Sequence, residues 1–294
     1  SADQPNSSGN AAATDKPYEY RIGIANLFKA FLGFKPPFPS PLVRSGDAAV
    51  RDNGAAVARS TAAGGIIFAH GMLGSRFDMA TLCETLAREG FVVSAADFAE
   101  SISASFAPNS ATSRSAIIDA EMSLLAQDFG VQEFGIFGHS AGGGSATMTQ
   151  GPFTLGRCAI AGVRPYVGSD PLYIVASSGD GVIPIDRVRM ALTSDMKVAS
   201  DPADINWKLQ RSAALLIDGP VRGADFAPNH ISFLDYEANA ALVKVLSPLL
   251  PLARLLGLPT LDFAVYKDRL DAKQTAEAVR PSIVEFFTSK KKRR

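Results

Sequence analysis

Short apolar runs alternate with amphipathic stretches along the chain from residue 65 onward. Residues 65–69 (GIIFA) form a continuous apolar run, as expected of a strand that is buried on both faces of a sheet. Similar runs predict further strands over residues 91–96, 133–138, 157–161, 172–177 and 213–217. Apolar positions at helical spacing predict helices over residues 76–89, 113–129 and 185–192. Strands that alternate with helices predict an α/β fold, with a mostly parallel central sheet covered by helices on both faces.

Capping residues support two of these helices. Ser75 and Asp78 stand where the first helix begins, and Gly90 stands where it ends. Gly130 follows the second helix, which carries Ile118, Met122 and Leu125 on one face.

The two ends of the chain differ in pattern from this central part. Residues 1–16 are rich in Ser, Ala, Asn and Asp and predict a disordered leader. Residues 17–61 predict an N-terminal extension, in which residues 22–34 form an amphipathic helix that packs on the domain or lies on a lipid surface. A catalytic domain is expected over residues 62–289, followed by a basic tail over residues 290–294. That tail is either a solvated segment or a contact for an anionic membrane surface.

Composition narrows the possible functions. The 294 residues are 47% hydrophobic, which is enough for a large core, and 29 Lys and Arg balance 29 Asp and Glu. This balance argues against nucleic acid as a partner. The two cysteines, Cys83 and Cys158, predict buried free thiols, and no Cys/His spacing of a zinc site is present. The most apolar stretch, residues 240–258, contains Lys244 and Arg254 and two prolines, so it does not predict a transmembrane helix.

The sequence GHSAG at residues 138–142 lies between a predicted strand and a predicted small-residue helix. This is the context of a nucleophile elbow, a sharp turn that lifts a serine hydroxyl above the sheet. The turn leaves room only for small neighbours, which explains the glycines on either side of Ser140. The helix that follows also favours negative charge near its N-terminus. We therefore interpret Ser140 as a nucleophile.

A second motif, HGMLGS at residues 70–75, directly follows the strand predicted at 65–69. Acyl transfer at a serine requires N–H groups that stabilise an oxyanion. In a sheet of this kind one N–H comes from the residue after the nucleophile, here Ala141, and the other from the loop after an early strand, here Met72. The same loop is also suited to capping the next helix, and the two roles are compatible.

A serine nucleophile needs a base, and the chain has three histidines. His70 lies in the predicted oxyanion loop and His139 lies inside the elbow, so neither is placed to face Ser140. His230, in the loop after the last predicted strand, is the remaining candidate.

The acid that orients this base comes between serine and histidine in chain order. Asp180, in a Gly-Asp-Gly turn after the strand at 172–177, is the first candidate, although such a turn is also common without function. Asp218, after the next strand, is the second candidate. Asp170 precedes its strand and is expected at the opposite end of the sheet.

The motifs GHSAGG, HGMLGS, GDGVIP and NHISF, in this order, resemble the α/β-hydrolase superfamily from about residue 62 onward. Within it, the segment from residue 66 to 97 looks like the branch of platelet-activating-factor acetylhydrolases, chlorophyllases and polyester hydrolases. The chain departs from that branch in two places. Residues 158–165 offer no carboxylate where the acetylhydrolases have their acid, and Ala141 stands where chlorophyllases commonly have Arg.

The resemblance implies hydrolysis of an ester with an apolar part, through an acyl-serine intermediate and without metal or cofactor. Transfer of the acyl group to another alcohol, or an inactive binding protein on the same scaffold, remain alternatives. Residues near the motifs are candidates for the substrate pocket: His70, Leu73, His139 and Phe98. Phe106, Met72 and residues 242–258 line an apolar pocket or belong to the core and its cover.

Overall fold

The computed structural model describes residues 19–22, 29, 33–34, 42–45, 62–101, 107, 110–224, 226–249, 251, 255 and 272–291. Two short strands, β1 (Glu19–Ile22) and β2 (Leu42–Ser45), pair antiparallel ahead of the main sheet. The leader predicted at 1–16 and nearly all of the helix predicted at 22–34 lie outside the described residues. Ile22, where that helix was expected to begin, is instead the last residue of β1.

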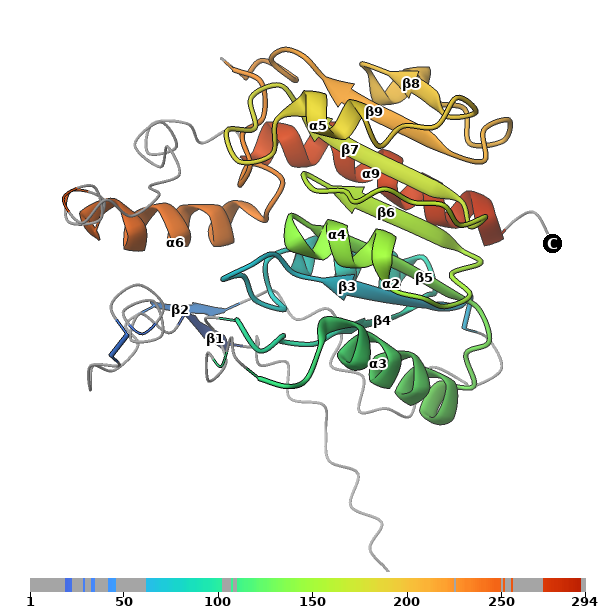
Figure 1. Ribbon diagram of the computed structural model, residues 1–294, viewed down its shortest axis with the longest axis horizontal. Coiled ribbons are helices and arrows are strands. Elements are labelled where there is room, and N and C mark those ends of the chain that lie inside the picture. Colours follow the sequence, from blue (N-terminus) through green and yellow to red (C-terminus); the bar gives the residue numbers. More distant parts are fainter. Residues whose placement is uncertain are drawn as a thin grey trace, which may run out of the picture.

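Seven parallel strands form the central sheet (Figure 1). In chain order they are β3 (Gly65–Ala69), β4 (Val92–Ala95), β5 (Phe134–His139), β6 (Gly156–Ile160), β7 (Leu172–Ser177), β8 (Lys197–Ala199) and β9 (Ala213–Ile217). Their order across the sheet is β4-β3-β5-β6-β7-β9-β8. The chain therefore runs from β3 to the edge at β4, crosses to β5 and then winds the other way. In open parallel sheets, ligands bind at the carboxyl ends of the strands where the winding direction changes, here between β3 and β5.

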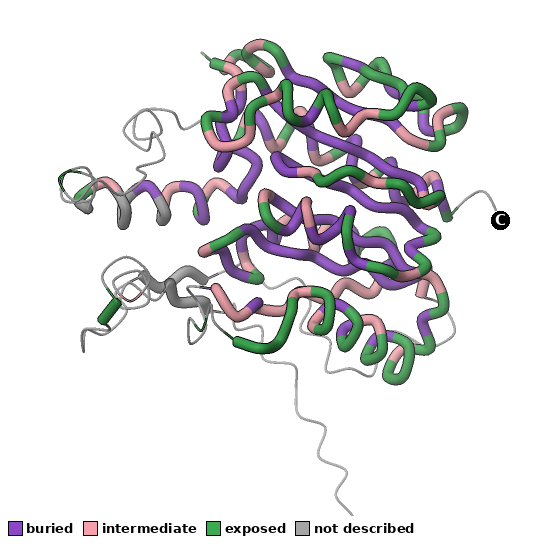
Figure 2. Tube along the Cα trace, viewed as in Figure 1, coloured by how far each residue is buried: buried purple, intermediate pink, exposed green. Residues whose placement is uncertain are grey.

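Helices cover both faces of this sheet, as the burial along the chain shows (Figure 2). The helices α3 (Arg114–Phe129), α4 (Ala141–Met148) and α5 (Ile185–Arg189) lie in front of the sheet in Figure 1, and α2 (Ala80–Arg88) and α9 (Ala272–Lys291) lie behind it. Successive side chains of a strand point to opposite faces of the sheet, so each strand contributes to the core on both faces. Ile66 and Phe68 pack into the core beneath α2 and α9, whereas Ile67 and Ala69 pack into the core beneath α3 and α4. The remaining helical elements are η1 (Pro202–Asp204), α6 (Tyr236–Leu246) and η2 (Ser247–Leu249).

This topology is the α/β-hydrolase fold, and the predicted fold class is confirmed. All six strands predicted in the main sheet are present within one or two residues of their expected bounds. The helix predicted at 76–89 begins only at Ala80, because Ser75 and Asp78 hydrogen-bond to each other in the preceding turns. Both cysteines are free thiols; Cys158 is buried and Cys83 is partly buried.

The C-terminal helix α9 was not predicted, although it closes one face of the sheet. Its Val279, Ile283, Phe286 and Phe287 are buried at helical spacing. Lys290 is also buried, with its Nζ donating to Gln210 O at 3.2 Å and lying 5.1 Å from the ring centroids of Trp207 and Phe286. Lys290, which the sequence assigned to a basic tail, belongs to α9, and its aliphatic stem covers aromatic rings.

Two further findings concern the described part of the chain only. None of its helices is long and apolar enough to cross a membrane. No group of three His, Cys, Asp or Glu side chains within it is arranged to hold a metal ion. The predicted membrane contact depends largely on segments outside this part and stays a prediction.

A buried carboxyl group lies between α3 and the edge of the sheet. Glu121, on the same helix face as Ile118 and Leu125, accepts a hydrogen bond from Ser94 Oγ on β4 at 2.7 Å. Burial raises the pKa of Glu121 to about 7, since the charged form loses its hydration.

We expect Glu121→Gln to change how stability depends on pH. A carboxyl whose pKa is raised by folding favours the folded state fully below its unfolded pKa of about 4.3, and that contribution is lost as pH rises through 7. Glutamine does not titrate and keeps an acceptor for Ser94. The free energy of unfolding of the variant, measured by urea denaturation and compared with the parent, should therefore gain roughly 2 kcal/mol between pH 5 and pH 8. A difference that does not vary with pH would contradict this.

Candidate active site

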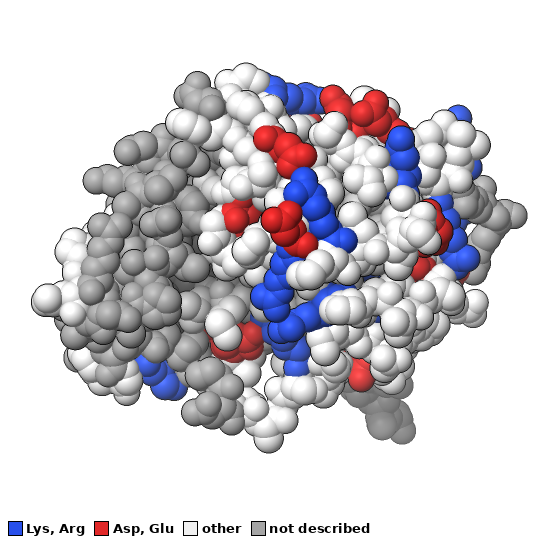
Figure 3. All heavy atoms as spheres, turned by 45° about the horizontal axis from the view of Figure 1, so that its top comes forward, with Lys and Arg blue, Asp and Glu red and all other residues white. Residues whose placement is uncertain are grey.

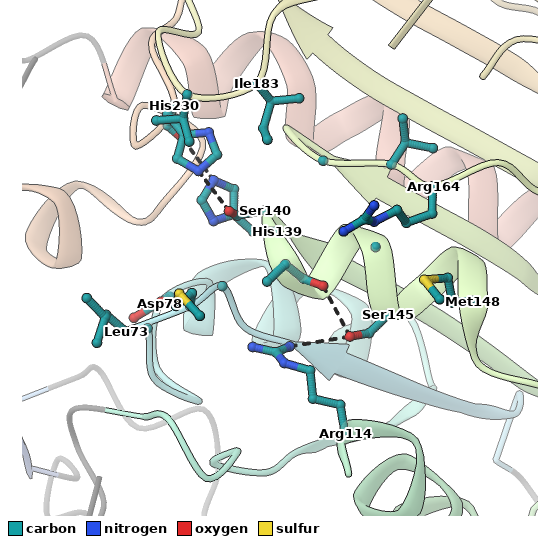
Figure 4. A pocket seen from close by; sticks show the side chains of 18 of the residues that line it. Leu73, Asp78, Arg114, His139, Ser140, Ser145, Met148, Arg164, Ile183 and His230 are labelled. Carbon is teal, nitrogen blue, oxygen red and sulfur yellow. Dashed lines mark hydrogen bonds between the residues drawn. The ribbon is translucent and has the colours of Figure 1, made fainter. Parts of the chain in front are cut away.

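Ser140 lies at the turn from β5 into α4, with backbone dihedrals of φ 56° and ψ −119°. Positive φ is rare for a residue with a side chain and stores local strain. Hydrogen bonds hold the turn from two sides. Ser140 N donates to Ile160 O at 2.8 Å, and Gly144 N donates to Ser140 O at 3.2 Å. The strained turn projects the hydroxyl of Ser140 into a cavity at the carboxyl end of the sheet (Figure 4).

Glycines around this turn allow neighbouring backbones to approach closely. A Cβ atom on Gly138 would lie 2.2 Å from Gly142 O, and one on Gly142 would lie 1.8 Å from Ala69 O. Gly162, in the loop after β6, is equally constrained, because its Cβ would lie 2.2 Å from Ser140 O. The GHSAG motif accounts for the first two glycines. Nothing in the sequence indicated that Gly162 is constrained, because the loop that contains it has no recognisable motif.

A continuous chain of hydrogen bonds joins Ser140, His230 and Asp180. Ser140 Oγ lies 2.8 Å from His230 Nε2, and His230 Nδ1 lies 2.9 Å from Asp180 Oδ2 and 3.1 Å from Oδ1. Because a carboxylate only accepts, Nδ1 carries the proton and Nε2 is free to accept from the serine hydroxyl. His230 and Asp180 are each 6% exposed. The structure therefore brings together the three residues that the sequence indicated, from the loops after β5, β7 and β9.

Backbone groups fix the carboxylate of Asp180. Its Oδ1 accepts the N–H groups of Val182 and Ile183 at 2.8 and 2.9 Å, which closes the turn after β7. The alternative candidates are elsewhere. Asp218 has a side chain 56% exposed and lies 3.6 Å from Arg189, and Asp170 is bound to Arg157.

His139 supports the loop that carries His230. Its Nε2 donates to His230 O at 2.7 Å, and the two imidazole rings are 4.8 Å apart. Burial, together with the neighbouring His230, lowers the pKa of His139 to about 3, so the ring is neutral and acts as a donor. Asn229 closes the same loop by accepting the N–H groups of Ile231 and Ser232 on its Oδ1. The sequence placed His139 in the pocket, and it does line the cavity.

The loop of residues 70–75 lies against the elbow. A Cβ atom on Gly71 would lie 3.2 Å from Ser140 Cβ. The backbone N–H groups of Met72 and Ala141 have no acceptor within the described part of the chain, and both residues line the cavity beside Ser140. Leu73, which also lines the cavity, holds a positive φ of 58°. Two unpaired N–H groups next to a serine hydroxyl are the arrangement that an oxyanion requires.

His70 and Phe98 do not line the cavity, in contrast to the prediction. His70 is fully buried beneath the loop, where Nδ1 donates to Gly71 O at 2.7 Å and Nε2 accepts from Phe98 N at 2.9 Å. Burial lowers the pKa of His70 to about 4, which keeps the ring neutral in this role. Phe98 is 1% exposed, with its ring between the His70 ring and the guanidinium of Arg114. Both residues support the loop from below. Phe106 and most of residues 250–258 lie outside the described residues.

The buried Arg157 on β6 holds the far end of α4. Its Nη1 donates to Ala146 O and Thr149 O at 2.8 Å, its Nη2 donates to Gly151 O at 3.0 Å, and its Nε donates to Asp170 at 2.9 Å. These bonds satisfy carbonyls at the end of the helix that begins at Ser140. Nothing in the sequence pattern singled out this arginine, because all but one of its partners are backbone carbonyls.

The cavity above Ser140 has a volume of about 770 Å³. Much of its wall is apolar, formed by Met72, Leu73, Met148, Val163, Ile183, Ile231 and Leu234. Figure 4 shows that Ser140, His139 and His230 lie at one side of this space and Arg114, Ser145 and Arg164 at the other. A serine with a hydrogen-bonded imidazole and two free N–H groups can attack a carbonyl carbon, and the cavity gives room for an apolar substrate.

No family model matches the chain, and no curated protein was found to be similar in sequence. Several solved structures resemble it at low identity. A metagenome-derived lipolytic enzyme is 17% identical over 65% of this chain and 95% of its own, with a TM-score of 0.42. A ferulic acid esterase from Streptomyces cinnamoneus is 16% identical over 91% of this chain and 77% of its own, also with a TM-score of 0.42.

A third structure, a thermophilic esterase from Thermogutta terrifontis, is 17% identical over 66% of this chain and 84% of its own, with a TM-score of 0.40. Identities and TM-scores this low do not define a substrate. The chemistry proposed below therefore rests on the geometry of the site.

Two neighbouring glycines of α4 offer a matched test of the elbow. We expect Gly142→Ala to abolish soluble, folded protein or to destabilise it by at least about 3 kcal/mol, because the new methyl overlaps Ala69 O. Gly144→Ala should leave the free energy of unfolding unchanged or raise it by about 0.5–1 kcal/mol, because its Cβ meets only Arg164 Cγ, at 3.5 Å, and alanine favours helix. Urea denaturation measures both. Equal effects of the two substitutions would contradict the close packing at Gly142.

Proposed function

We propose that the protein is a serine hydrolase that cleaves carboxylic esters through an acyl-Ser140 intermediate. The observation that carries the proposal is the hydrogen-bonded chain from Asp180 through His230 to Ser140, which ends in a cavity. The order of the three groups and the distances between them suit transfer of a proton from the serine hydroxyl to the imidazole.

In the first half of the proposed reaction, Ser140 Oγ attacks the ester carbonyl carbon as its proton passes to His230 Nε2. The carbonyl oxygen becomes an oxyanion, which the N–H groups of Met72 and Ala141 stabilise. Asp180 stabilises the imidazolium that forms and keeps its Nδ1–H in place. His230 then gives the proton to the leaving alcohol, the carbon–oxygen bond breaks, and the acyl group stays on Ser140.

In the second half, a water molecule gives its proton to His230 Nε2 and attacks the acyl carbon. The same two N–H groups stabilise the tetrahedral intermediate. His230 then returns the proton to Ser140 Oγ, the bond between Oγ and the acyl carbon breaks, and the carboxylic acid leaves. The outcome depends on which hydroxyl compound reaches the acyl group. We propose water, since Ser140 is only partly buried.

The apolar wall of the cavity supports an ester with a lipophilic part. Met148, Val163 and Ile183 face the space next to Ser140, and burial of an alkyl group there contributes about 0.8 kcal/mol per methylene. The acetylhydrolases, chlorophyllases and polyester hydrolases that the sequence resembles also act on esters with an apolar part.

We expect the parent protein to hydrolyse p-nitrophenyl esters of medium-chain acids and to react with a fluorophosphonate at Ser140. Ser140→Ala removes the nucleophile, so kcat should fall by about 10⁴-fold or more and labelling should cease. Release of p-nitrophenol and mass spectrometry of the labelled peptide measure the two effects. Because a lost hydroxyl does not disturb folding, the variant should unfold at the urea concentration of the parent.

Turnover by Ser140→Ala at the rate of the parent would overturn the proposal. A parent that neither turns over any ester nor reacts with the fluorophosphonate would instead favour a binding protein on this scaffold.

Two aspartates test the assignment of the acid. In Asp180→Asn the side chain no longer fixes the imidazole tautomer, and kcat should fall by about 10³- to 10⁴-fold. Asp218→Asn removes the same charge at an exposed position, and kcat should change less than about twofold. Initial rates with one p-nitrophenyl ester compare the two variants. Equal losses, or a larger loss in Asp218→Asn, would show that Asp180 is not the acid.

A further inference from the structure

Two arginines that line the cavity have no partner among the residues that the structure describes. Most arginines whose side chains the structure describes are held by a carboxylate or a carbonyl, as Arg157 is by Asp170 and Arg114 by Glu100. Arg164 and Arg187 are exposed, line the same cavity as Ser140, and form no hydrogen bond or ion pair through their guanidinium groups within the described part of the chain. Guanidinium groups left free beside a reactive serine are available to a ligand.

The fold places both arginines above the carboxyl end of the sheet. Arg164 follows β6, and its N–H donates to Thr147 Oγ1 on α4 at 3.1 Å, which fixes its backbone to the helix of the elbow. Its side chain extends into the cavity toward Ser140 (Figure 4). Arg187 lies in the short helix α5, next to Val182 and Ile183 of the cavity wall. Figure 3 shows Lys and Arg side chains interspersed with Asp and Glu side chains across one face of the molecule.

Carboxyl groups of the protein do not cancel this charge inside the cavity. Asp78 is the one acidic residue among the described residues that line it. Asp78 is 6% exposed and accepts a hydrogen bond from Ser75 Oγ at 2.8 Å. Burial raises the pKa of Asp78 to about 7, which favours its neutral form more than in an exposed carboxyl. The cavity therefore combines an apolar wall with a surplus of positive charge.

We propose that the ester cleaved at Ser140 carries an anionic group, a carboxylate or a phosphate, which Arg164 and Arg187 bind. This inference rests on the proposed function. Met148, Val163 and Ile183 line the same cavity and give it an apolar wall that suits the rest of the substrate. Arginine suits such an anion, since its planar guanidinium donates two parallel hydrogen bonds to carboxylate or phosphate oxygens.

The test uses two substrates of equal chain length, p-nitrophenyl octanoate and the mono-p-nitrophenyl ester of octanedioic acid. They differ only in a terminal methyl or carboxylate. For the parent, kcat/KM should be higher with the carboxylate ester, mainly through a lower KM. Raising KCl from 50 to 500 mM should remove most of that preference, because salt screens exposed charges.

Substitution of each arginine should act on one substrate only. With the carboxylate ester, Arg164→Gln and Arg187→Gln should each lower kcat/KM about threefold to fivefold, and the double variant about tenfold or more. With the octanoate ester, kcat/KM should change less than about twofold. Arg222→Gln is the matched control, because Arg222 is another exposed arginine that lacks a charge partner among the described residues and lies outside this cavity. It should change neither substrate.

Competing ligands distinguish a phosphate from a carboxylate as the anionic group of the substrate. Octylphosphate and octanoate, added as inhibitors of p-nitrophenyl octanoate hydrolysis, present a phosphate and a carboxylate on the same chain. If octylphosphate inhibits more tightly than octanoate, and the double arginine variant loses this difference, the anionic group of the carboxylic ester substrate is a phosphate. If octanoate inhibits more tightly than octylphosphate, and the double variant loses this difference, the anionic group is a carboxylate.

Failure of the inference is distinct from failure of the proposed function. If the parent hydrolyses octanoate in a Ser140-dependent way but shows no preference for the carboxylate ester, and the arginine variants match Arg222→Gln, the anion site is wrong and the hydrolase stands. If neither ester is hydrolysed, calorimetric binding of the uncleaved p-nitroanilide of octanedioic acid to the parent decides. Binding that weakens about tenfold in the double variant keeps the anion site, and equal binding removes it.

Discussion

The close packing of backbone at the Ser140 turn is the constraint on which the rest of the site depends. Ala69 O of β3, Gly142 of α4 and Gly162 after β6 meet around one residue, at distances that leave no space for a Cβ atom. This contact forces Ser140 into its positive-φ conformation and brings the loop after β3 against the loop after β5. The proposed nucleophile and the N–H groups of Met72 and Ala141 are therefore placed by main-chain contacts, and no long side chain has to be ordered.

The residues that we propose activate Ser140 are held in a similar way, by backbone groups and neutral side chains. Asp180 receives two N–H groups of its own turn, and His139 holds the His230 loop through one carbonyl. His70 supports the loop of residues 70–75 through a hydrogen bond to the carbonyl of Gly71. Burial keeps both of these histidines neutral, so each adds a hydrogen bond without placing charge near the reaction. The three histidines thus have three distinct roles, and one of them faces the serine.

The sequence indicated much of this arrangement because its signals are local. An apolar run followed by GHSAG or HGMLGS fixes a strand, a turn and a helix start within about ten residues, and Asp180 and His230 follow strands in the same way. Longer-range features left no such signal. Phe286 and Phe287 in α9 pack over glycines of β5 and β6, yet a charged helix with Pro281 inside it has only a weak apolar pattern. Phe98 was expected in the pocket, but its ring is covered by His70 and Arg114, and such coverage depends on tertiary contacts. Strand β8 was not predicted either, because its three residues are too few to form a recognisable pattern.

The central claim, an acyl group carried on Ser140, is tested most directly by trapping that intermediate. The protein would be mixed with p-nitrophenyl octanoate, quenched in acid within milliseconds, digested and examined by mass spectrometry. The account predicts an octanoyl group on the peptide that contains Ser140, and its loss when the quench follows exhaustion of substrate. Continued turnover with no acyl group on that peptide, or with the acyl group on another residue, would contradict it.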